Sequence, residues 1–201
     1  MYKEQKWDKT LTPEFQAEWK KVAGHTLLTL PKMQRLIDFL HYAAKLEGNA
    51  AEVGVYKGGS AKMIAQILHH KKVYLFEAFK GLPKPDRERK DYLPQGAFAD
   101  ITEASIKDFL KEHANIEWRV GWFPNTAEGL IDTFCFVHVD CDLYAAVKSC
   151  CEFFHPKMSK GGVMIFDDYG YELTGGAKTA VDEYFGKNNV IYLGDHAIVI
   201  C

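Results

Sequence analysis

Short apolar runs alternate with segments of helical periodicity along most of this chain of 201 residues. The apolar runs cover residues 50–55, 73–76, 116–120, 134–139 and 163–166. Apolar residues recur at helical spacing within 36–44, 61–68, 106–113, 147–154 and 177–185. Short strands that are almost entirely apolar are typical of a parallel sheet that helices cover on both faces. The alternation therefore predicts a doubly wound α/β domain.

The end of the chain breaks this alternation. Two apolar runs, 190–193 and 197–200, follow each other across a short turn at Gly194 and Asp195. Two strands joined in this way pair antiparallel. We therefore expect a mostly parallel seven-stranded sheet with an antiparallel edge.

Length and charge limit the possible partners. A chain of this size buries about 70% of its extended surface, which suits one domain spanning residues 1–201. The 27 acidic residues against 25 lysines and arginines give a net charge of −2, so we expect no nucleic-acid partner. No apolar run approaches the ~20 residues that cross a bilayer, and residues 1–21 lack the core of a signal peptide. We therefore expect no membrane partner.

Five cysteines without a C-x-x-C spacing favour a reducing compartment, and we expect a cytoplasmic protein. Two segments lie outside the regular alternation. Residues 1–25 are polar with scattered aromatic residues and are predicted to form an N-terminal arm or short helix, which could cover a second copy in a homo-oligomer. Residues 81–100 hold three of the seven prolines and a dense charge cluster. They are either a solvated loop or a lid over a pocket.

A glycine-rich turn follows the first predicted strand and precedes a helix. Gly54 permits a tight turn, and Gly58 with Gly59 would let a ligand approach the backbone at the helix start. Tyr56 occupies the place of the middle glycine of G-x-G-x-x-G, and the P-loop pattern is also absent, so a purely structural turn stays open. Glu77 ends the second strand, where an acid can accept hydrogen bonds from ribose hydroxyls.

Two pairs of acidic residues end neighbouring predicted strands. Asp140 and Asp142 follow one strand, and Asp167 and Asp168 follow the next. Four clustered carboxylates repel one another unless a cation or shared protons intervene, and no arginine partner is evident. Oxygen ligands of this kind favour Mg²⁺, Mn²⁺ or Ca²⁺ over zinc. The alternative is that these residues are separate helix caps and solvated turns.

Five short blocks in one order carry a family resemblance, namely 52–60, 76–86, 121–126, 139–144 and 161–169. On these blocks, which span roughly residues 35–185, the chain resembles the class I S-adenosylmethionine-dependent methyltransferases. Within that class it is similar to the macrocin O-methyltransferase family. The resemblance implies a Rossmann-like methyltransferase fold with S-adenosyl-L-methionine and Mg²⁺ (or Mn²⁺) as cofactors.

The resemblance also implies roles for individual residues. Glu52, Gly54 and Gly58 would line the methionine side of the cofactor. Tyr56 and Ser60 would lie nearby, and Gly59 would be a further cofactor-binding residue of the same turn. Glu77 would hold the ribose hydroxyls, with a reach one methylene longer than the family's usual aspartate. Gly121 and Trp122 would border the adenine, and Asp140, Asp167 and Asp168 would bind the metal.

Asp142 is the candidate general base. Catechol-type relatives carry a lysine base where this chain has Leu143, which leaves Asp142 as the nearest acceptor for the hydroxyl proton. If the strand continues, Asp140 and Asp142 point to the same side. The alternative is that Asp142 caps the helix that begins near Tyr144. Because two vicinal hydroxyls can chelate a metal, we expect a small-molecule acceptor of the sugar-diol or catechol type.

Two other functions stay open from the sequence. Asp140-x-Asp142 is a D-x-D motif that a nucleotide-sugar glycosyltransferase could use to bind Mn²⁺ and a diphosphate. The chain could also be a non-catalytic binding module that keeps the fold. The glycine turn paired with Glu77 favours the methyltransferase over the glycosyltransferase.

Overall fold

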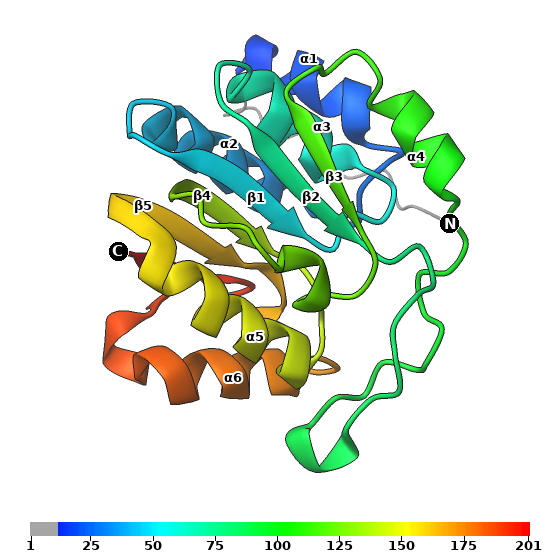
Figure 1. Ribbon diagram of the computed structural model, residues 1–201, viewed down its shortest axis with the longest axis vertical. Coiled ribbons are helices and arrows are strands. Elements are labelled where there is room, and N and C mark those ends of the chain that lie inside the picture. Colours follow the sequence, from blue (N-terminus) through cyan, green and yellow to red (C-terminus); the bar gives the residue numbers. More distant parts are fainter. Residues whose placement is uncertain (1–11) are drawn as a thin grey trace.

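The computed structural model describes residues 12–201 and confirms the predicted fold class (Figure 1). The strands are β1 Asn49–Val53, β2 Val73–Glu77, β3 Ile116–Val120, β4 Phe134–Val139, β5 Met158–Phe166, β6 Ile191–Tyr192 and β7 Ala197–Ile200. The α-helices are α1 Pro13–Val22, α2 Leu30–Ala43, α3 Gly59–Ile67, α4 Glu103–Phe109, α5 Tyr144–Phe154 and α6 Gly175–Phe185. Helix α1 lies in the predicted arm, whose first 11 residues are outside the described part of the chain.

The sheet has the order β3-β2-β1-β4-β5-β7-β6. Strands β1 to β5 pair in parallel, and β7 runs antiparallel to both β5 and β6, as the paired final runs predict. The strand order reverses between β1 and β4. Ligands of doubly wound folds bind at this switch point, beyond the carboxyl ends of the strands.

Two apolar layers hold the helices to the sheet. Helices α1, α2 and α3 cover one face, and α5 and α6 cover the other (Figure 1). Successive strand residues serve opposite layers: Ala50 packs under α2 and α3, while Ala51 and Val53 pack with the α5 and α6 side. Both faces are buried, which is the physical reason for the unbroken apolar runs.

Strand β5 is longer than its apolar run predicts. It begins at Met158 rather than Val163, so Gly161 and Gly162 lie inside the strand instead of closing the preceding helix. The pairing register with β4 shifts here, from Phe134–Met158 to Phe136–Val163. Gly161 has a φ of +80°, a conformation that glycine adopts without strain, and this allows the irregular stretch.

Residues 81–100 are a long connection with one short 3-10 helix, η1 Arg87–Arg89. The connection extends from the sheet toward α6 before returning to α4 (Figure 1). Asp91 anchors it: the buried carboxylate accepts hydrogen bonds from the amides of Tyr144 (3.0 Å) and Asp86 (3.3 Å). Asp91 also forms an antiparallel bridge with Thr174. Asp91 therefore fastens the segment to the rest of the domain at one buried point, while most of the residues around it stay exposed to solvent.

A search of residues 12–201 finds no helix with the length and apolar content needed to cross a membrane.

Candidate active site

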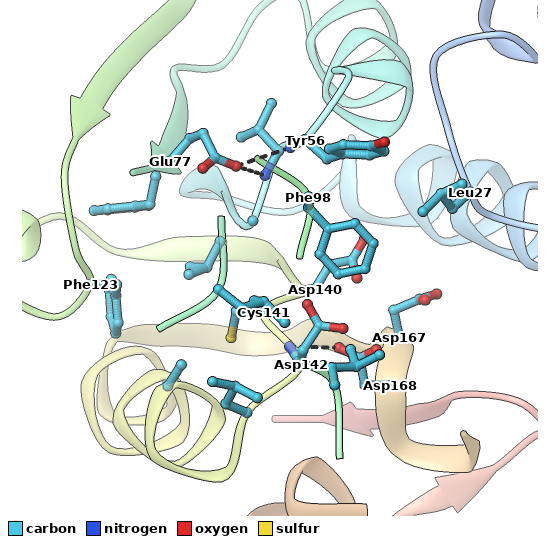
Figure 2. A pocket seen from close by; sticks show the side chains of 18 of the residues that line it. Leu27, Tyr56, Glu77, Phe98, Phe123, Asp140, Cys141, Asp142, Asp167 and Asp168 are labelled. Atoms are coloured by element: carbon cyan, nitrogen blue, oxygen red, sulfur yellow. Dashed lines mark hydrogen bonds between the residues drawn. The ribbon is translucent and has the colours of Figure 1, made fainter. Parts of the chain in front are cut away.

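A cavity of about 950 Å³ opens beyond the carboxyl ends of β1, β2, β4 and β5. Nine of the predicted site residues line it: Gly54, Tyr56, Glu77, Gly121, Trp122, Asp140, Asp142, Asp167 and Asp168. Figure 2 shows Glu77 and Tyr56 in one part of the view and the aspartates in another. The switch-point location places the predicted cofactor turn and the acidic residues around one space.

Glu77 ties the end of β2 to the turn after β1 (Figure 2). Its Oε2 accepts hydrogen bonds from the amides of Val55 (2.9 Å) and Tyr56 (3.0 Å), and its Oε1 accepts one from Phe79 (2.8 Å). The carboxylate therefore shapes the turn as well as facing the cavity. Replacing Glu77 by alanine would disturb the turn itself, so that substitution does not isolate a ribose contact.

The turn brings two strand ends unusually close. Gly54 has a φ of +88°, and a Cβ placed there would lie 1.8 Å from the carbonyl oxygen of Asp140. Only glycine fits this approach. Tyr56 also has a positive φ, and its hydroxyl donates to Asp100 at 2.9 Å while its ring meets Phe98 edge-on. The turn thus contacts the far end of the 81–100 segment.

Four predicted cofactor residues do not line the cavity: Glu52, Gly58, Gly59 and Ser60. A Cβ at Gly58 would meet Ile106 and Phe109 of α4, each at 3.3 Å. A Cβ at Gly59 would lie 2.6 Å from the carbonyl oxygen of His25. Both glycines therefore allow close packing against neighbouring segments of the chain rather than facing the cavity. Ser60 is buried within α3.

Glu52 is fully buried beside His138 of the neighbouring strand. The Nδ1 atom of His138 lies 2.8 Å from Oε1 of Glu52. Burial opposes protonation of His138, but the hydrogen bond and the charge of Glu52 outweigh it and raise the pKa of His138 to about 9. Glu52 thus forms a buried ion pair with His138. The strand register places the two residues side by side, and the sequence pattern did not predict this pairing.

Gly121 and Trp122 follow β3 at the other side of the cavity. The amide of Gly121 donates to the carbonyl of Glu77 at 2.9 Å, which fixes this turn against the end of β2. Trp122 stays 41% exposed, so its ring is open to a flat ligand rather than committed to the core.

Asp140, Asp167 and Asp168 converge at the ends of β4 and β5. One carboxylate oxygen from each residue lies within 4.8 Å of the others. Burial, followed by repulsion from Asp167 and Asp168, raises the pKa of Asp140 well above its usual range. Burial, followed by repulsion from Asp167, raises the pKa of Asp168 to about 7. The three carboxylates therefore repel one another, and their oxygen atoms are the ligands that Mg²⁺ or Mn²⁺ prefers.

Lys32 is a cation at this cluster that the sequence reasoning missed. Its ammonium donates to Oδ2 of Asp167 at 2.8 Å and to the carbonyl of the same residue at 2.9 Å. Burial alone would lower the pKa of Lys32, but the carboxylates of Asp167, Asp140 and Asp168 raise it overall. No local pattern links α2 with a strand end 135 residues later, so only the fold brings these groups together.

Asp142 does not continue the strand. Strand β4 ends at Val139, and Asp142 has a φ of +61°, so the expected alternation that would point Asp140 and Asp142 to one side does not apply. The Asp142 amide donates to Oδ2 of Asp168 at 2.9 Å, as Figure 2 shows. The alternative role as a helix cap is wrong, because Asp91 accepts the hydrogen bond from the first amide of α5.

Apolar side chains from separate segments border the rest of the cavity. Leu82, Leu93 and Phe98 come from the 81–100 segment, Leu27 from the segment before α2, and Tyr171 from the loop after β5. Leu27 and Tyr171 are 56% and 53% exposed, which marks an open apolar rim. These segments are the part of the site that can select a second small molecule.

The residues present fit both expected cofactors. Three convergent carboxylates form an oxygen donor set for a divalent ion. The volume of the cavity lies in the usual range for small-molecule sites, and Trp122 and Glu77 supply a flat surface and an acceptor.

The mostly parallel sheet, the glycine turn with its strand-end acid and the adjoining aspartates match what the family resemblance implies for an S-adenosylmethionine-dependent O-methyltransferase. The chain belongs to the macrocin-O-methyltransferase (TylF) family, whose model matches residues 2–192. This membership confirms the resemblance that the five sequence blocks indicated.

Two curated relatives of the chain are O-methyltransferases of Streptomyces species. The chain is 25% identical over 195 residues to 8-demethyl-8-(2,3-dimethoxy-alpha-L-rhamnosyl)-tetracenomycin-C 4'-O-methyltransferase of Streptomyces olivaceus, covering 86% of this chain and 72% of that protein. It is 25% identical over 186 residues to demethyldecarbamoylnovobiocin O-methyltransferase of Streptomyces niveus, covering 83% and 70%.

Solved structures share the fold. The O-methyltransferase NovP matches with a TM-score of 0.76 and 22% identity, covering 88% of this chain and 81% of that one. An O-methyltransferase of Bacillus cereus, solved in complex with SAH, matches with a TM-score of 0.61 and 15% identity, covering 94% and 91%.

Proposed function

We propose that this enzyme methylates a hydroxyl of a small molecule with a sugar-diol or catechol-like group, using S-adenosylmethionine and a divalent ion, Mg²⁺ or Mn²⁺. One observation carries the proposal: the three convergent aspartates open into the same cavity as Glu77 and Trp122. A methyl acceptor bound at the aspartates would therefore lie beside a cofactor held at the ends of β1, β2 and β3.

The proposed cofactor contacts are the predicted residues that face the cavity. Trp122 offers its exposed ring to the adenine, beside Gly121. Glu77 accepts a hydrogen bond from a ribose hydroxyl on Oε1. This oxygen accepts only one backbone hydrogen bond, whereas Oε2 already accepts two. Gly54 and Tyr56 border the methionine portion. Glu52, Gly58, Gly59 and Ser60 act by building this turn from behind.

The metal would be held by Asp140, Asp167 and Asp168. When bound, the two cofactors supply an electrophilic methyl group and a charge that acidifies the acceptor hydroxyl. Asp142 takes the hydroxyl proton on a carboxylate oxygen, since no lysine stands at the next position. Its backbone amide is fixed on Asp168, so the proton acceptor is tied to a metal ligand. The chain also contributes by holding the acceptor hydroxyl in line with the methyl group of the cofactor.

The names of similar proteins support a sugar hydroxyl as the acceptor. One relative methylates the 4' position of a rhamnosyl tetracenomycin, and a structure of TDP-rhamnose 3'-O-methyltransferase shares the fold. The apolar rim around Leu27 and Tyr171 would contact the part of the substrate that is attached to the methylated sugar or ring.

Chelation tests the metal requirement. We expect excess EDTA to abolish methyl transfer from labelled S-adenosylmethionine to a panel of vicinal diols and catechols, and added Mg²⁺ or Mn²⁺ to restore it. The metal ligands are tested by Asp168→Asn, which should give the same loss. Full transfer in excess EDTA would remove the metal from the proposal.

Asp142→Asn tests the base. The substitution keeps the shape of the side chain and removes the basic oxygen, so we expect the transfer rate to fall roughly 10²–10⁴-fold. Binding of S-adenosylhomocysteine and of Mn²⁺ should be unchanged, because the backbone amide of Asp142 still reaches Asp168. A near-normal rate would assign the proton to bulk water instead.

A further inference from the structure

The acidic site contains a fixed cation of its own. Lys32 extends from the first turn of α2 to the cluster, and its side chain is 13% exposed, close to the 14% of its partner Asp167. The ammonium bonds to both the carboxylate and the carbonyl of Asp167, so one oxygen of that carboxylate is already occupied. A divalent ion bound by Asp167 would share the carboxylate with Lys32.

The helix does not need this side chain for its own formation. The α2 N-terminus is capped by Thr29, whose hydroxyl accepts from the backbone amide of Lys32, and Pro31 lies in the first turn. A solvent-facing direction would be the ordinary place for a lysine, because a buried ammonium is costly unless it is paired. Its position is therefore explained by the aspartates rather than by the helix.

Charge counting gives this contact a consequence. Asp140, Asp167 and Asp168 carry three negative charges when ionised. Lys32 supplies one positive charge and a divalent ion supplies two, so together they balance the three ligand carboxylates, with the neighbouring Asp142 outside this count. Without Lys32, one negative charge stays unmatched after a divalent ion has bound. Like charges on Lys32 and the ion also repel each other across the shared carboxylate.

We propose that Lys32 is a built-in competitor of the divalent ion: it keeps the three aspartates together before the metal arrives and weakens the binding of the metal, so that the ion exchanges readily. This inference rests on the proposed metal site. It assigns Lys32 as a positioning residue, acting through Asp167, that sets metal affinity.

Metal titration of the full chain without S-adenosylmethionine or acceptor tests the proposal. Mn²⁺ would be titrated calorimetrically into the wild type, Lys32→Met and Lys32→Arg, with melting temperatures recorded with and without Mn²⁺. Coulomb repulsion between a divalent and a monovalent cation about 6 Å apart in a water-like medium predicts about tenfold tighter binding in Lys32→Met, and the burial of the pair makes this a lower bound. Lys32→Arg keeps the charge and should retain the weak affinity of the wild type.

Lys72→Met is the matched control for loss of a charge. Lys72 pairs with Glu117 at the opposite end of the sheet, just before β2 begins. Its removal should leave the Mn²⁺ affinity unchanged. Without metal, Lys32→Met should melt below the wild type, and Mn²⁺ should raise its melting temperature more than that of the wild type. If Lys32→Met does not fold, Lys32→Gln provides the same comparison.

The outcomes separate this inference from the proposed function. Wild type that binds Mn²⁺ while Lys32→Met binds it equally or more weakly overturns the competitor role and leaves the metal site standing. Lys32→Met that binds Mn²⁺ where the wild type binds none supports the competitor role in its strongest form. No Mn²⁺ binding by either protein overturns both the inference and the metal half of the proposed function.

Discussion

Asp91→Ala should destabilise the protein although the residue lies in a long connecting segment. The Asp91 side chain is 2% exposed. Its carboxylate caps the first amide of α5 at 3.0 Å and accepts from the Asp86 amide at 3.3 Å. A Cβ on Gly176 would lie 2.0 Å from the Asp91 carboxylate, so the fit against α6 is close.

The magnitude follows from these contacts. Loss of a capping side chain costs about 0.5–2 kcal/mol, and an unsatisfied buried donor costs about 1–3 kcal/mol. The two figures overlap, because both count the amide of Tyr144. Burial raises the pKa of Asp91, so the charge itself is held at a cost that alanine would relieve. We therefore expect the free energy of unfolding to fall by about 2 kcal/mol.

Urea unfolding followed by far-ultraviolet circular dichroism measures this loss. Asp86→Ala is the matched control, because Asp86 is exposed and its side chain caps only the three-residue η1, so we expect a loss of about 0.5 kcal/mol, at the low end for a cap. Asp91→Asn keeps one acceptor oxygen and should lie between the two variants. An Asp91→Ala protein as stable as Asp86→Ala would refute the anchoring of the 81–100 segment by this carboxylate.

Three further substitutions test the floor and wall of the site. Gly54→Ala should cost at least about 3 kcal/mol in urea unfolding, since its Cβ would overlap the Asp140 carbonyl, and wild-type stability would contradict the turn geometry. Glu52→Ala should cost about 3–5 kcal/mol by stranding charged His138, and replacing both residues by leucine should cost less; equal losses would argue against a buried ion pair. Trp122→Ala should leave the melting temperature unchanged but weaken S-adenosylhomocysteine roughly tenfold by calorimetry, and unchanged affinity would remove the adenine contact.

The sequence predicts the sheet because burial on both faces forces each strand to be apolar along its whole length. The antiparallel edge is predictable for a different reason, because two successive apolar runs joined by a short turn pair antiparallel. The start of β5 at Met158 escaped prediction because residues 159–162 carry no apolar pattern. Met158 and Val163 on either side pair with β4, and Gly161 and Gly162 bond to the backbone of Cys201.

Parts of the site that lie at strand ends were predictable, since the carboxyl ends of parallel strands meet at one edge. The strand ends group four aspartates in this way, namely Asp140, Asp142, Asp167 and Asp168, and the family resemblance singles out Asp140, Asp167 and Asp168 as the metal ligands. The contacts of Lys32 and Asp91 were not predictable, because each side chain crosses from a helix or loop to an element far away along the chain. The cap of α5 shows the limit most clearly: local sequence favours Asp142, and the fold supplies Asp91.

Ligand binding by calorimetry tests the central claim most directly. The wild-type protein would be titrated with S-adenosylhomocysteine and, separately, with a UDP-sugar in the presence of Mn²⁺. A methyltransferase site predicts one S-adenosylhomocysteine per chain, with binding weakened by Trp122→Ala, and no heat from the UDP-sugar. Binding of the UDP-sugar without binding of S-adenosylhomocysteine would contradict the account.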